Sequence, residues 1–348
     1  MGNIKIQAIG TATPQYAISQ EEGKAFAFRA FGQSYKDINR LLAVFDNSHI
    51  SKRYVSMPLH WYQEEHSFTE ANRIYQLVGI DLVEKASRAA MTEAGVEPKD
   101  IGAIIFVSST GIATPTIDAS LTQKLGLPEN SKRIPIWGLG CAGGVSGLAR
   151  AAEIAGITKG KSVLLVALEL CSLTFQRDDF SKANLVGASI FSDGAAAVLL
   201  SVGGKGPEIV DSFSHLFPNS ADIMGWDIIE TGLKVRFSKT IPHIIKKCLP
   251  ELLNKACNAW TIESKEIEHY IVHPGGAKVI EAYKESLGLT DEALRYARQN
   301  LHDFGNMSSA SILFEIKDFM SQNIKEGKYG VLLALGPGFS AEQVLFKW

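Results

Sequence analysis

Two pairs of short, continuously apolar segments constrain the fold of this chain more than any other feature. In the first half, the apolar segment at residues 101–107 is followed by a second one at 160–169. In the second half, residues 267–272 are followed in the same way by residues 327–336. The later segment of each pair begins with Gly-Lys and continues into Leu-Leu, which suggests two copies of one element. Strands that are apolar along their whole length are typical of sheets covered by helices on both faces.

Segments with helical spacing of apolar residues alternate with these predicted strands. They cover residues 81–95, 241–260, 278–287 and 309–320. This alternation predicts an α/β fold in which a duplicated unit forms layered helices and sheets. The Gly- and Pro-rich stretch at 203–207 is the best boundary, which gives halves at residues 1–205 and 206–348.

The composition excludes several classes of function. The 348 residues are 46% hydrophobic with a net charge of −2, so we expect a sizeable core and no general affinity for nucleic acid. The four cysteines lack CxxC or Cys/His zinc spacing, which predicts reduced thiols and no metal site. The N-terminus does not resemble a signal peptide, and no apolar run approaches the ~18 residues needed to span a bilayer. We therefore expect a cytoplasmic protein without membrane insertion.

Cys141 is the leading candidate for a nucleophile. It follows an apolar stretch and two glycines, and it precedes an Ala-rich segment with helical spacing that continues to Gly156. A strand that turns sharply into a helix would place this thiol at a helix N-terminus, where the helix dipole favours the thiolate. The alternative is a buried structural cysteine, and the local sequence does not separate the two.

Two polar residues in glycine-containing turns could complete a site with Cys141. His273 follows the apolar segment 267–272, where it could act as a base or donor, or simply be satisfied within a loop. Asn306 precedes an apolar helical segment, where asparagine is usually an N-cap. As a set, a Cys–His pair provides a nucleophile and a His–Asn pair provides two donors for an enolate or oxyanion. That combination suits carbon–carbon bond formation through thioesters.

The motifs around these residues resemble those of the type III polyketide synthases, the chalcone-synthase-like group of the thiolase superfamily. The matching stretches are His273-Pro-Gly-Gly, Gly305-Asn306-Met-Ser-Ser-Ala and Phe191-Ser-Asp-Gly-Ala-Ala. The resemblance covers nearly the whole chain and implies a thiolase-like duplicated αβαβα layered fold. It also implies a Cys141–His273–Asn306 triad, acyl-CoA and malonyl-CoA substrates, a homodimer, and no metal or other cofactor.

The same resemblance assigns the walls of a substrate cavity. Phe191 matches the family's gatekeeper, and counting back 38 residues from His273 leads to Val235, where plant enzymes carry a second gatekeeper Phe. Cys171 stands where plant enzymes have a cavity threonine, with Thr174 three residues later. Further cavity residues implied by the resemblance are Ser308 and the loop Gly336, Pro337, Gly338 and Phe339. This loop and the Cys141 amide are candidates for an oxyanion hole.

The cations that the family uses for CoA phosphates are only partly present. Arg40 fits the pattern, but Ala43 and Asn47 stand where further cations are expected. Three basic residues could replace them: Lys52, Arg53 and Lys278.

Within the family, residues 133–144, 169–176 and 334–340 look like the bacillus-type alkylpyrone synthases. This resemblance implies that a medium- or long-chain fatty acyl starter is loaded on Cys141 and extended with malonyl-CoA by decarboxylative Claisen condensation. The product would be a cyclised polyketide such as an alkylpyrone, and the small Val235 favours a fatty over a bulky aromatic starter.

Two alternatives remain at this point. A β-ketoacyl-carrier-protein synthase III-like enzyme would share the triad, although that family usually reads His-Gln-Ala-Asn and Asn-Thr-Ser at the two motifs. A non-catalytic ketosynthase-like partner subunit belongs to another class, although such proteins typically lose the nucleophilic cysteine.

Overall fold

The computed structural model describes residues 3–322, 324 and 326–348. Within these residues, nine strands form one mixed sheet: β1 (Ile4–Ala12), β4 (Ile101–Ser108), β5 (Lys132–Trp137), β6 (Ser162–Leu170), β7 (Asp193–Val202), β8 (Glu208–Leu216), β11 (Ile267–Val272), β12 (Tyr329–Gly336) and β13 (Ser340–Lys347). Their order in space is β11-β12-β13-β8-β1-β7-β6-β4-β5. The sheet therefore begins with strands of the second half of the chain and ends with strands of the first.

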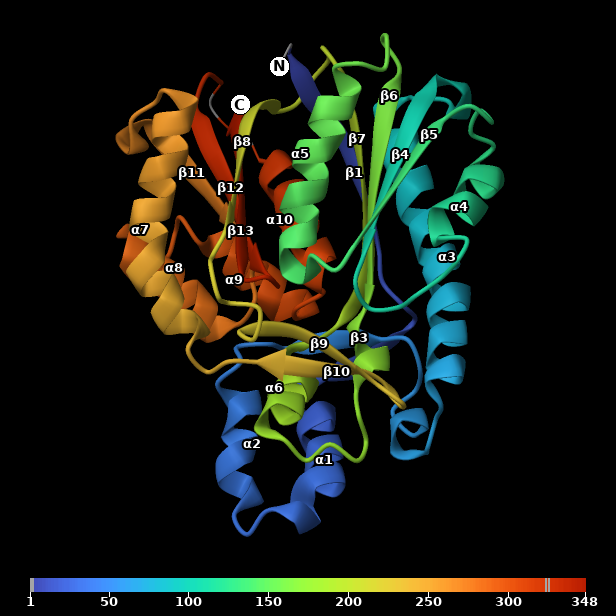
Figure 1. Cartoon of the computed structure of the whole chain (residues 1–348), viewed down its shortest axis with the longest axis vertical. Helices are drawn as coiled ribbons and strands as arrows, with labels where there is room; N and C mark the ends of the chain where they lie inside the picture. The colour runs from blue at the N-terminus through green and yellow to red at the C-terminus, as the bar shows by residue number, and fades with distance from the viewer. Residues whose placement is uncertain (1–2, 323, 325) are drawn as a thin grey trace.

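Helices and strands alternate in five layers (Figure 1). The central layer contains α5 (Gly143–Ala155) and α10 (Ser311–Met320), with strands of the sheet on either side. One outer layer contains α3 (Phe68–Ala94) and α4 (Ile117–Leu125), and the other contains α7 (Ile241–Trp260) and α8 (Ala277–Leu287). A further helix, α9 (Arg295–Phe304), packs against α10 and β11. This arrangement confirms the predicted αβαβα layers.

The sheet topology explains the repeated apolar segments. β4 lies parallel to β6, which pairs antiparallel with β7. In the second half, β11 lies parallel to β12, which pairs antiparallel with β13. The two Gly-Lys segments thus lead into β6 and β12, the equivalent strands of the two halves. The predicted boundary at 203–207 falls between β7 and β8, while β1 crosses it by pairing with both.

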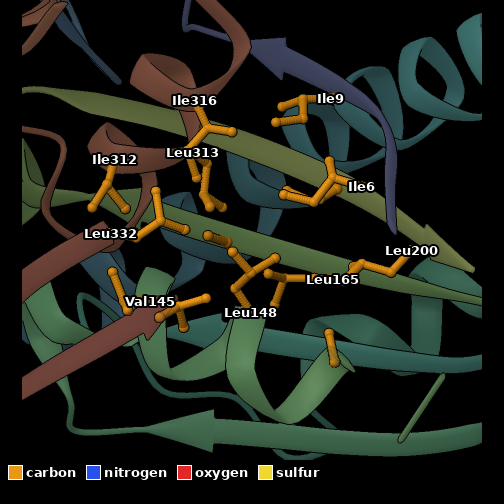
Figure 2. Packing of buried hydrophobic residues seen from close by; sticks show 14 of the residues in the cluster. Ile6, Ile9, Val145, Leu148, Leu165, Leu200, Ile312, Leu313, Ile316 and Leu332 are labelled. Carbon is orange, nitrogen blue, oxygen red and sulfur yellow. The ribbon is translucent and has the colours of Figure 1, made fainter. Parts of the chain in front are cut away.

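The central layer is held together by apolar side chains from both halves. Figure 2 shows Val145 and Leu148 of α5 facing Ile312 and Leu313 of α10, with strand residues around them. Gly144 permits this approach, because a Cβ there would lie 2.2 Å from the carbonyl oxygen of Ser309. The close packing fixes the N-terminus of α5, and with it Cys141, against the segment that carries Asn306.

A smaller region, here called the cap, covers one end of the layers (Figure 1). It consists of α1 (Gln20–Phe31), α2 (Ile38–Asp46), α6 (Lys182–Ile190), the β2–β3 pair (Tyr16–Ser19 and Lys52–Val55) and the β9–β10 pair (Met224–Ile229 and Gly232–Phe237). Ser19 and Glu22 form a capping box that starts α1. Sequence periodicity did not predict this region.

Helix boundaries agree with the sequence predictions except at one long helix and one helix start. The segment predicted as 81–95 is the C-terminal half of α3, which begins at Phe68 after the N-cap Ser67. Its first half was not predicted, because Gly79 stands where the helical pattern calls for a large apolar residue facing Leu168 on the sheet. Residues 308–310 form a 3-10 turn before α10, so this helix starts two residues later than predicted. Among the described residues, no helix has the length and apolar character needed to cross a bilayer.

Candidate active site

Cys141 lies where the sequence predicted, in a tight turn between β5 and α5. The turn is the 3-10 helix Gly140–Ala142, and α5 follows it directly. Gly140 has a φ of 46°, and its amide donates to the Ser109 hydroxyl at 3.0 Å. A Cβ at Gly140 would lie 2.8 Å from the Pro337 ring, so this position requires glycine for both reasons. The turn presents a thiol that is 8% exposed.

The resting form of Cys141 differs from the expected thiolate. Burial raises the pKa of the thiol to about 12, hydrogen bonding with the Ser308 and Asn306 side chains lowers it, and the buried Glu169 carboxyl raises it. The expectation that Cys141 rests as a thiolate is not met, because loss of solvent outweighs the dipole at the N-terminus of α5. The residue therefore rests as a thiol.

His273 lies at the end of β11 and is 3% exposed. Its backbone amide donates to the Leu333 carbonyl at 2.9 Å, which fixes the strand end against β12. Burial lowers the pKa of the imidazole to about 3, so the ring is neutral and can accept a proton. Neither ring nitrogen has a hydrogen-bond partner in the part of the chain that the structure describes.

Asn306 is held by hydrogen bonds on both sides of its amide. Its Nδ2 donates to the Gly275 carbonyl at 3.1 Å, and its Oδ1 accepts from the Ser308 amide at 2.8 Å. Its backbone forms a bridge with Phe191, which joins the site to the gatekeeper. The N-cap alternative was wrong, because α10 begins only at Ser311 and its N-cap is Ala310.

These three side chains line one cavity, although they come from three distant segments. The cavity has an empty volume of about 1090 Å³, open mouth included, and its walls include Tyr283 and Leu335. Lys278, an expected CoA ligand, lies among the lining residues and is exposed. Two exposed lysines that the sequence gave no reason to select, Lys182 and Lys239, line the same cavity.

The other expected CoA ligands lie elsewhere. Arg40 and Lys52 are exposed on α2 and β3 of the cap. Arg53 is only 4% exposed, and its guanidinium donates to the Phe191 carbonyl at 3.0 Å and to Gln20 Oε1 at 3.1 Å. The prediction that Arg53 contacts a CoA phosphate was wrong, because its side chain is buried and its guanidinium is hydrogen-bonded to the backbone of Phe191 and to Gln20.

A second cavity lies behind Phe191. Its empty volume is about 560 Å³, open mouth included, and the expected wall residues Phe191, Cys171, Thr174 and Val235 all line it. The other lining residues are mostly apolar and come largely from the cap; they include Ile18, Phe26, Val55, Leu59 and Phe175. The Phe191 ring packs against Phe237, which lines the first cavity, at a centroid distance of 5.4 Å. Phe191 therefore stands between the two cavities.

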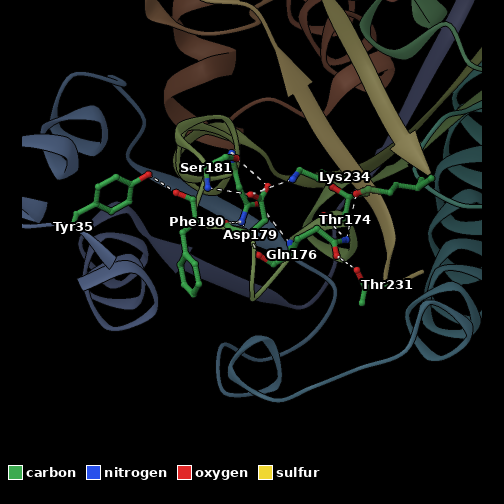
Figure 3. Close-up of polar contacts among 10 residues, drawn as sticks. Tyr35, Thr174, Gln176, Asp179, Phe180, Ser181, Thr231 and Lys234 are labelled. Atoms are coloured by element: carbon green, nitrogen blue, oxygen red, sulfur yellow. Dashed lines mark hydrogen bonds and ion pairs between the residues drawn. The ribbon is translucent and has the colours of Figure 1, made fainter. Parts of the chain in front are cut away.

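Polar contacts brace the wall of the second cavity from outside (Figure 3). Gln176 donates to the Thr174 carbonyl at 3.3 Å and accepts from Thr231 at 2.6 Å. Asp179 pairs with Lys234 at 3.4 Å. Because Thr231 and Lys234 flank or belong to β10, these bonds tie the strand of Val235 to the segment that carries Thr174.

The loop of Gly336, Pro337, Gly338 and Phe339 packs against the Cys141 turn. A Cβ at Gly336 would lie 2.4 Å from the Leu139 carbonyl oxygen, so the two loops are in close contact. Phe339 is fully buried, and its amide donates to the Ser220 hydroxyl at 2.7 Å. That N–H is therefore not free for an oxyanion, and the expectation for this residue was wrong.

Two buried carboxyl groups near the site were not predicted. Glu169 accepts hydrogen bonds from Ser309, Thr110 and the Ser109 amide, and burial raises its pKa to about 7. Asp193 accepts from Ser172 and Ser56, and burial raises its pKa to about 6. Each carboxyl lies at one end of an otherwise apolar strand, Glu169 on β6 and Asp193 on β7, and this pattern in the sequence could have indicated a buried polar site. In the part of the chain that the structure describes, no cluster of three or more His, Cys, Asp or Glu could hold a metal ion.

Comparisons with known proteins identify the family. The model of the chalcone and stilbene synthase N-terminal domain matches residues 1–205, and that of the C-terminal domain matches residues 208–348. A chalcone synthase relative from Bacillus subtilis is 45% identical, with 99% of this chain and 98% of that protein covered. The 1,3,6,8-tetrahydroxynaphthalene synthase of Streptomyces peucetius is 34% identical over 99% of this chain and 93% of its own.

Solved structures agree with the sequence matches. The 1,3,6,8-tetrahydroxynaphthalene synthase of Streptomyces coelicolor, a bacterial type III polyketide synthase, superposes with a TM-score of 0.94 at 28% identity, covering 99% of both chains. PKS-I of the brown alga Ectocarpus siliculosus superposes with a TM-score of 0.93 at 26% identity, covering 100% of this chain and 98% of its own. The chain belongs to the chalcone and stilbene synthase family of type III polyketide synthases, acyltransferases that extend their substrates by decarboxylative Claisen condensation.

Proposed function

We propose that this synthase loads a medium- or long-chain fatty acyl-CoA on Cys141, extends it with malonyl-CoA and releases a cyclised polyketide such as an alkylpyrone. The observation that carries the proposal is the adjacency of two cavities, since Phe191 of the second packs against Phe237 of the first. One contains Cys141, His273 and Asn306, and the other is lined mainly by apolar side chains. A fatty acyl chain held on Cys141 would gain about 0.8 kcal/mol for each methylene buried in the second cavity.

In the loading step, Cys141 passes its thiol proton to His273 as its sulfur attacks the thioester carbonyl of the starter. The new acyl–sulfur bond replaces the bond to CoA, the CoA thiolate leaves and takes a proton from solvent, and His273 keeps the proton that it accepted from Cys141. The neutral resting states of Cys141 and His273 fit this order, because proton transfer then accompanies attack.

In the extension step, His273 and Asn306 donate hydrogen bonds to the thioester carbonyl of malonyl-CoA. Asn306 uses one Nδ2–H for the Gly275 carbonyl, which leaves the second for substrate. Loss of CO₂ leaves an enolate that these donors stabilise. The enolate carbon attacks the acyl-cysteine carbonyl, the bond to the Cys141 sulfur breaks, and the departing thiolate takes its proton back from His273. Neither step requires a redox group or a metal, so the proposal includes none.

The CoA moieties would enter past the lysines at the mouth of the first cavity. Lys182, Lys239 and Lys278 are exposed there, on α6, beside β10 and on α8 respectively. Cationic side chains of this kind suit the phosphate groups of CoA. With four free thiols in the chain, we place this reaction in the reducing environment of the cytoplasm.

The test is mass spectrometry of the products formed from malonyl-CoA and a panel of starters. We expect alkylpyrones from C8–C18 acyl-CoAs, with slower turnover of aromatic starters. Faster turnover of aromatic starters would overturn the fatty-acyl assignment. A strict requirement for malonyl-carrier protein would instead favour the ketoacyl-carrier-protein synthase alternative, and a Cys141 that no acyl-CoA can load would favour the non-catalytic subunit.

We also propose that two copies of the chain associate through the outer edge of β5. Trp137 and Ile112 are 50% and 42% exposed, and with Ile228 they line an apolar recess beside this terminal strand. An apolar recess of this kind is typical of a protein–protein interface. Light scattering should give a dimer mass for the wild type and a monomer mass for Trp137→Glu; a monomeric wild type would refute the proposal.

A further inference from the structure

Among the buried polar atoms at and around His273, those of Tyr283 and Glu315 have no role in the condensation described above. Among the described residues, both ring nitrogens of His273, the hydroxyl of Tyr283 and Oε2 of Glu315 lack hydrogen-bond partners. All three side chains are at most 3% exposed. Because buried polar groups are nearly always hydrogen-bonded, their concentration here requires an explanation.

Glu315 is anchored beside His273 at the free edge of the sheet. β11 is the terminal strand, and the His273 amide bonds to β12, so the preceding amide of Val272 points away from the sheet. Glu315 Oε1 accepts from this amide at 3.3 Å. Ile271 packs in the central core layer with α10, and His273 projects to the same face because side chains two residues apart share a face. The Glu315 carboxyl and the His273 ring thus approach the strand end from one side.

Tyr283 lies near both Glu315, at the free edge of the sheet, and the nucleophile Cys141. Its side chain is fully buried on α8 and lines the same cavity as Cys141 and His273. It interacts electrostatically with both Cys141 and Glu315. Asn300 lies on α9, which packs against both β11 and α10. Neither polar atom of its buried side-chain amide has a partner among residues 3–322, 324 and 326–348. A polar interior with several unpartnered groups is the kind of site that holds internal water.

We propose that an internal water joins Nδ1 of His273 to Glu315 and Tyr283, and that Glu315 acts through it as a positioning residue. An imidazole that accepts the Cys141 proton at Nε2 carries its other proton on Nδ1, and that N–H needs an acceptor. The water would accept from Nδ1–H and donate to Glu315 Oε2 and Tyr283 Oη. This inference rests on the proposed role of His273 as the acceptor of the Cys141 proton.

The charge on Glu315 would then control how readily the thiolate forms. Burial raises the pKa of this carboxyl well above its usual range, and Asp318 raises it further. As the pH rises, the carboxyl releases its proton to solvent, and its negative charge then stabilises the imidazolium form of His273. The other titratable groups that face this arrangement or act on its members are Cys141, Tyr283, Glu169, Asp303 and the cavity lysines Lys182, Lys239 and Lys278.

The first test compares Glu315→Gln with wild type in the rate of iodoacetamide alkylation at Cys141 between pH 6 and 9. Glutamine keeps an acceptor for the Val272 amide but cannot ionise. We expect the two profiles to coincide at the acid end, where the raised pKa keeps Glu315 neutral, and alkylation of the variant to be about tenfold slower at the alkaline end, with an unchanged KM for malonyl-CoA. Superimposable profiles would overturn the inference.

Glu342→Gln is the matched control. Glu342 is also a buried carboxyl with a raised pKa, but it lies on β13 and accepts from Ser214 at 2.6 Å. We expect its alkylation profile to match that of the wild type. An equal slowing in Glu342→Gln would show a general effect of losing a buried carboxyl and would also overturn the inference.

Tyr283→Phe keeps the test decisive even if Glu315→Gln fails to fold. Removing a hydroxyl that bonds to water should lower Tm and slow alkylation by about threefold. In a dry pocket, removing an unsatisfied hydroxyl should raise Tm and leave alkylation unchanged, which would refute the internal water. If wild-type Cys141 is not alkylated selectively, or acyl-CoA does not protect it, the proposed function itself fails rather than this extension of it.

Discussion

The catalytic cavity and the cavity behind Phe191 are built from different parts of the molecule. Cys141 and His273 lie where a helix begins and a strand ends in the layered core. The second cavity is lined largely by α1, β3, α6 and β10 of the cap. The contrast indicates a division of labour in which the duplicated layers fix the chemistry and the cap determines which starter fits. The following predictions test that division, beginning with the largest expected effect.

Cys141→Ala should reduce condensation by at least about a thousandfold, because Cys141 supplies the one thiol among the described residues that line the cavity. Decarboxylation of malonyl-CoA should persist, since His273 and Asn306 remain. Release of CO₂ and formation of product can be measured in parallel. Normal condensation by this variant would show that the nucleophile has been misassigned.

Asn306→Ala should reduce decarboxylation by about a hundredfold or more, the cost of removing one oxyanion donor. Loading of the starter should be affected far less, because that step uses Cys141 and His273. Intact-protein mass spectrometry of the acyl-enzyme measures loading separately from CO₂ release. Equal losses in both steps would mean that Asn306 supports the whole site rather than the enolate.

Val235→Phe should shorten the preferred starter without changing the decarboxylation of malonyl-CoA. The side chain lies in the cluster with Cys171 and Phe191, so a larger ring would fill part of the second cavity. We expect about a tenfold lower kcat/KM for the longest acyl-CoAs and little change for the shortest. Unchanged chain-length preference would place the acyl chain outside this cavity.

Lys278→Ala should have the smallest effect, a rise in KM for malonyl-CoA of about fivefold with kcat unchanged, because an exposed cation contributes about 1 kcal/mol. The effect should shrink at high salt. Arg40→Ala is a suitable control, since Arg40 is also exposed but does not line the catalytic cavity. Equal effects of the two variants would indicate a diffuse surface field rather than a phosphate contact.

The sequence predicted the layered core better than the cap, for physical reasons. β6 and β12 are apolar along their length because both faces are buried, and that pattern is readable without a structure. The cap elements are short, and the β9–β10 pair is exposed on part of its surface, so periodicity gives little signal. Their positions depend on contacts between distant segments, such as the Arg53 bonds to Phe191 and Gln20.

Within the site, the sequence predicted where the residues lie better than it predicted their protonation states. The glycine turns around Cys141, His273 and Asn306 indicated that these residues belong together, and they do line one cavity. The direction of the Cys141 pKa could not be predicted, because it depends on burial and on Glu169 from a different strand. The sequence could not distinguish the buried Arg53 from the exposed cavity lysines either, because all are basic residues and only the fold determines which are buried.

The most direct test of the division of labour measures two quantities on Val235→Phe and Asn306→Ala side by side. One is kcat/KM for malonyl-CoA decarboxylation without a starter, and the other is the chain-length profile of acyl-enzyme formation on Cys141. We predict that Val235→Phe changes only the profile and that Asn306→Ala changes only decarboxylation. If either variant altered both quantities to a similar extent, the separation of chemistry from starter selection would be contradicted.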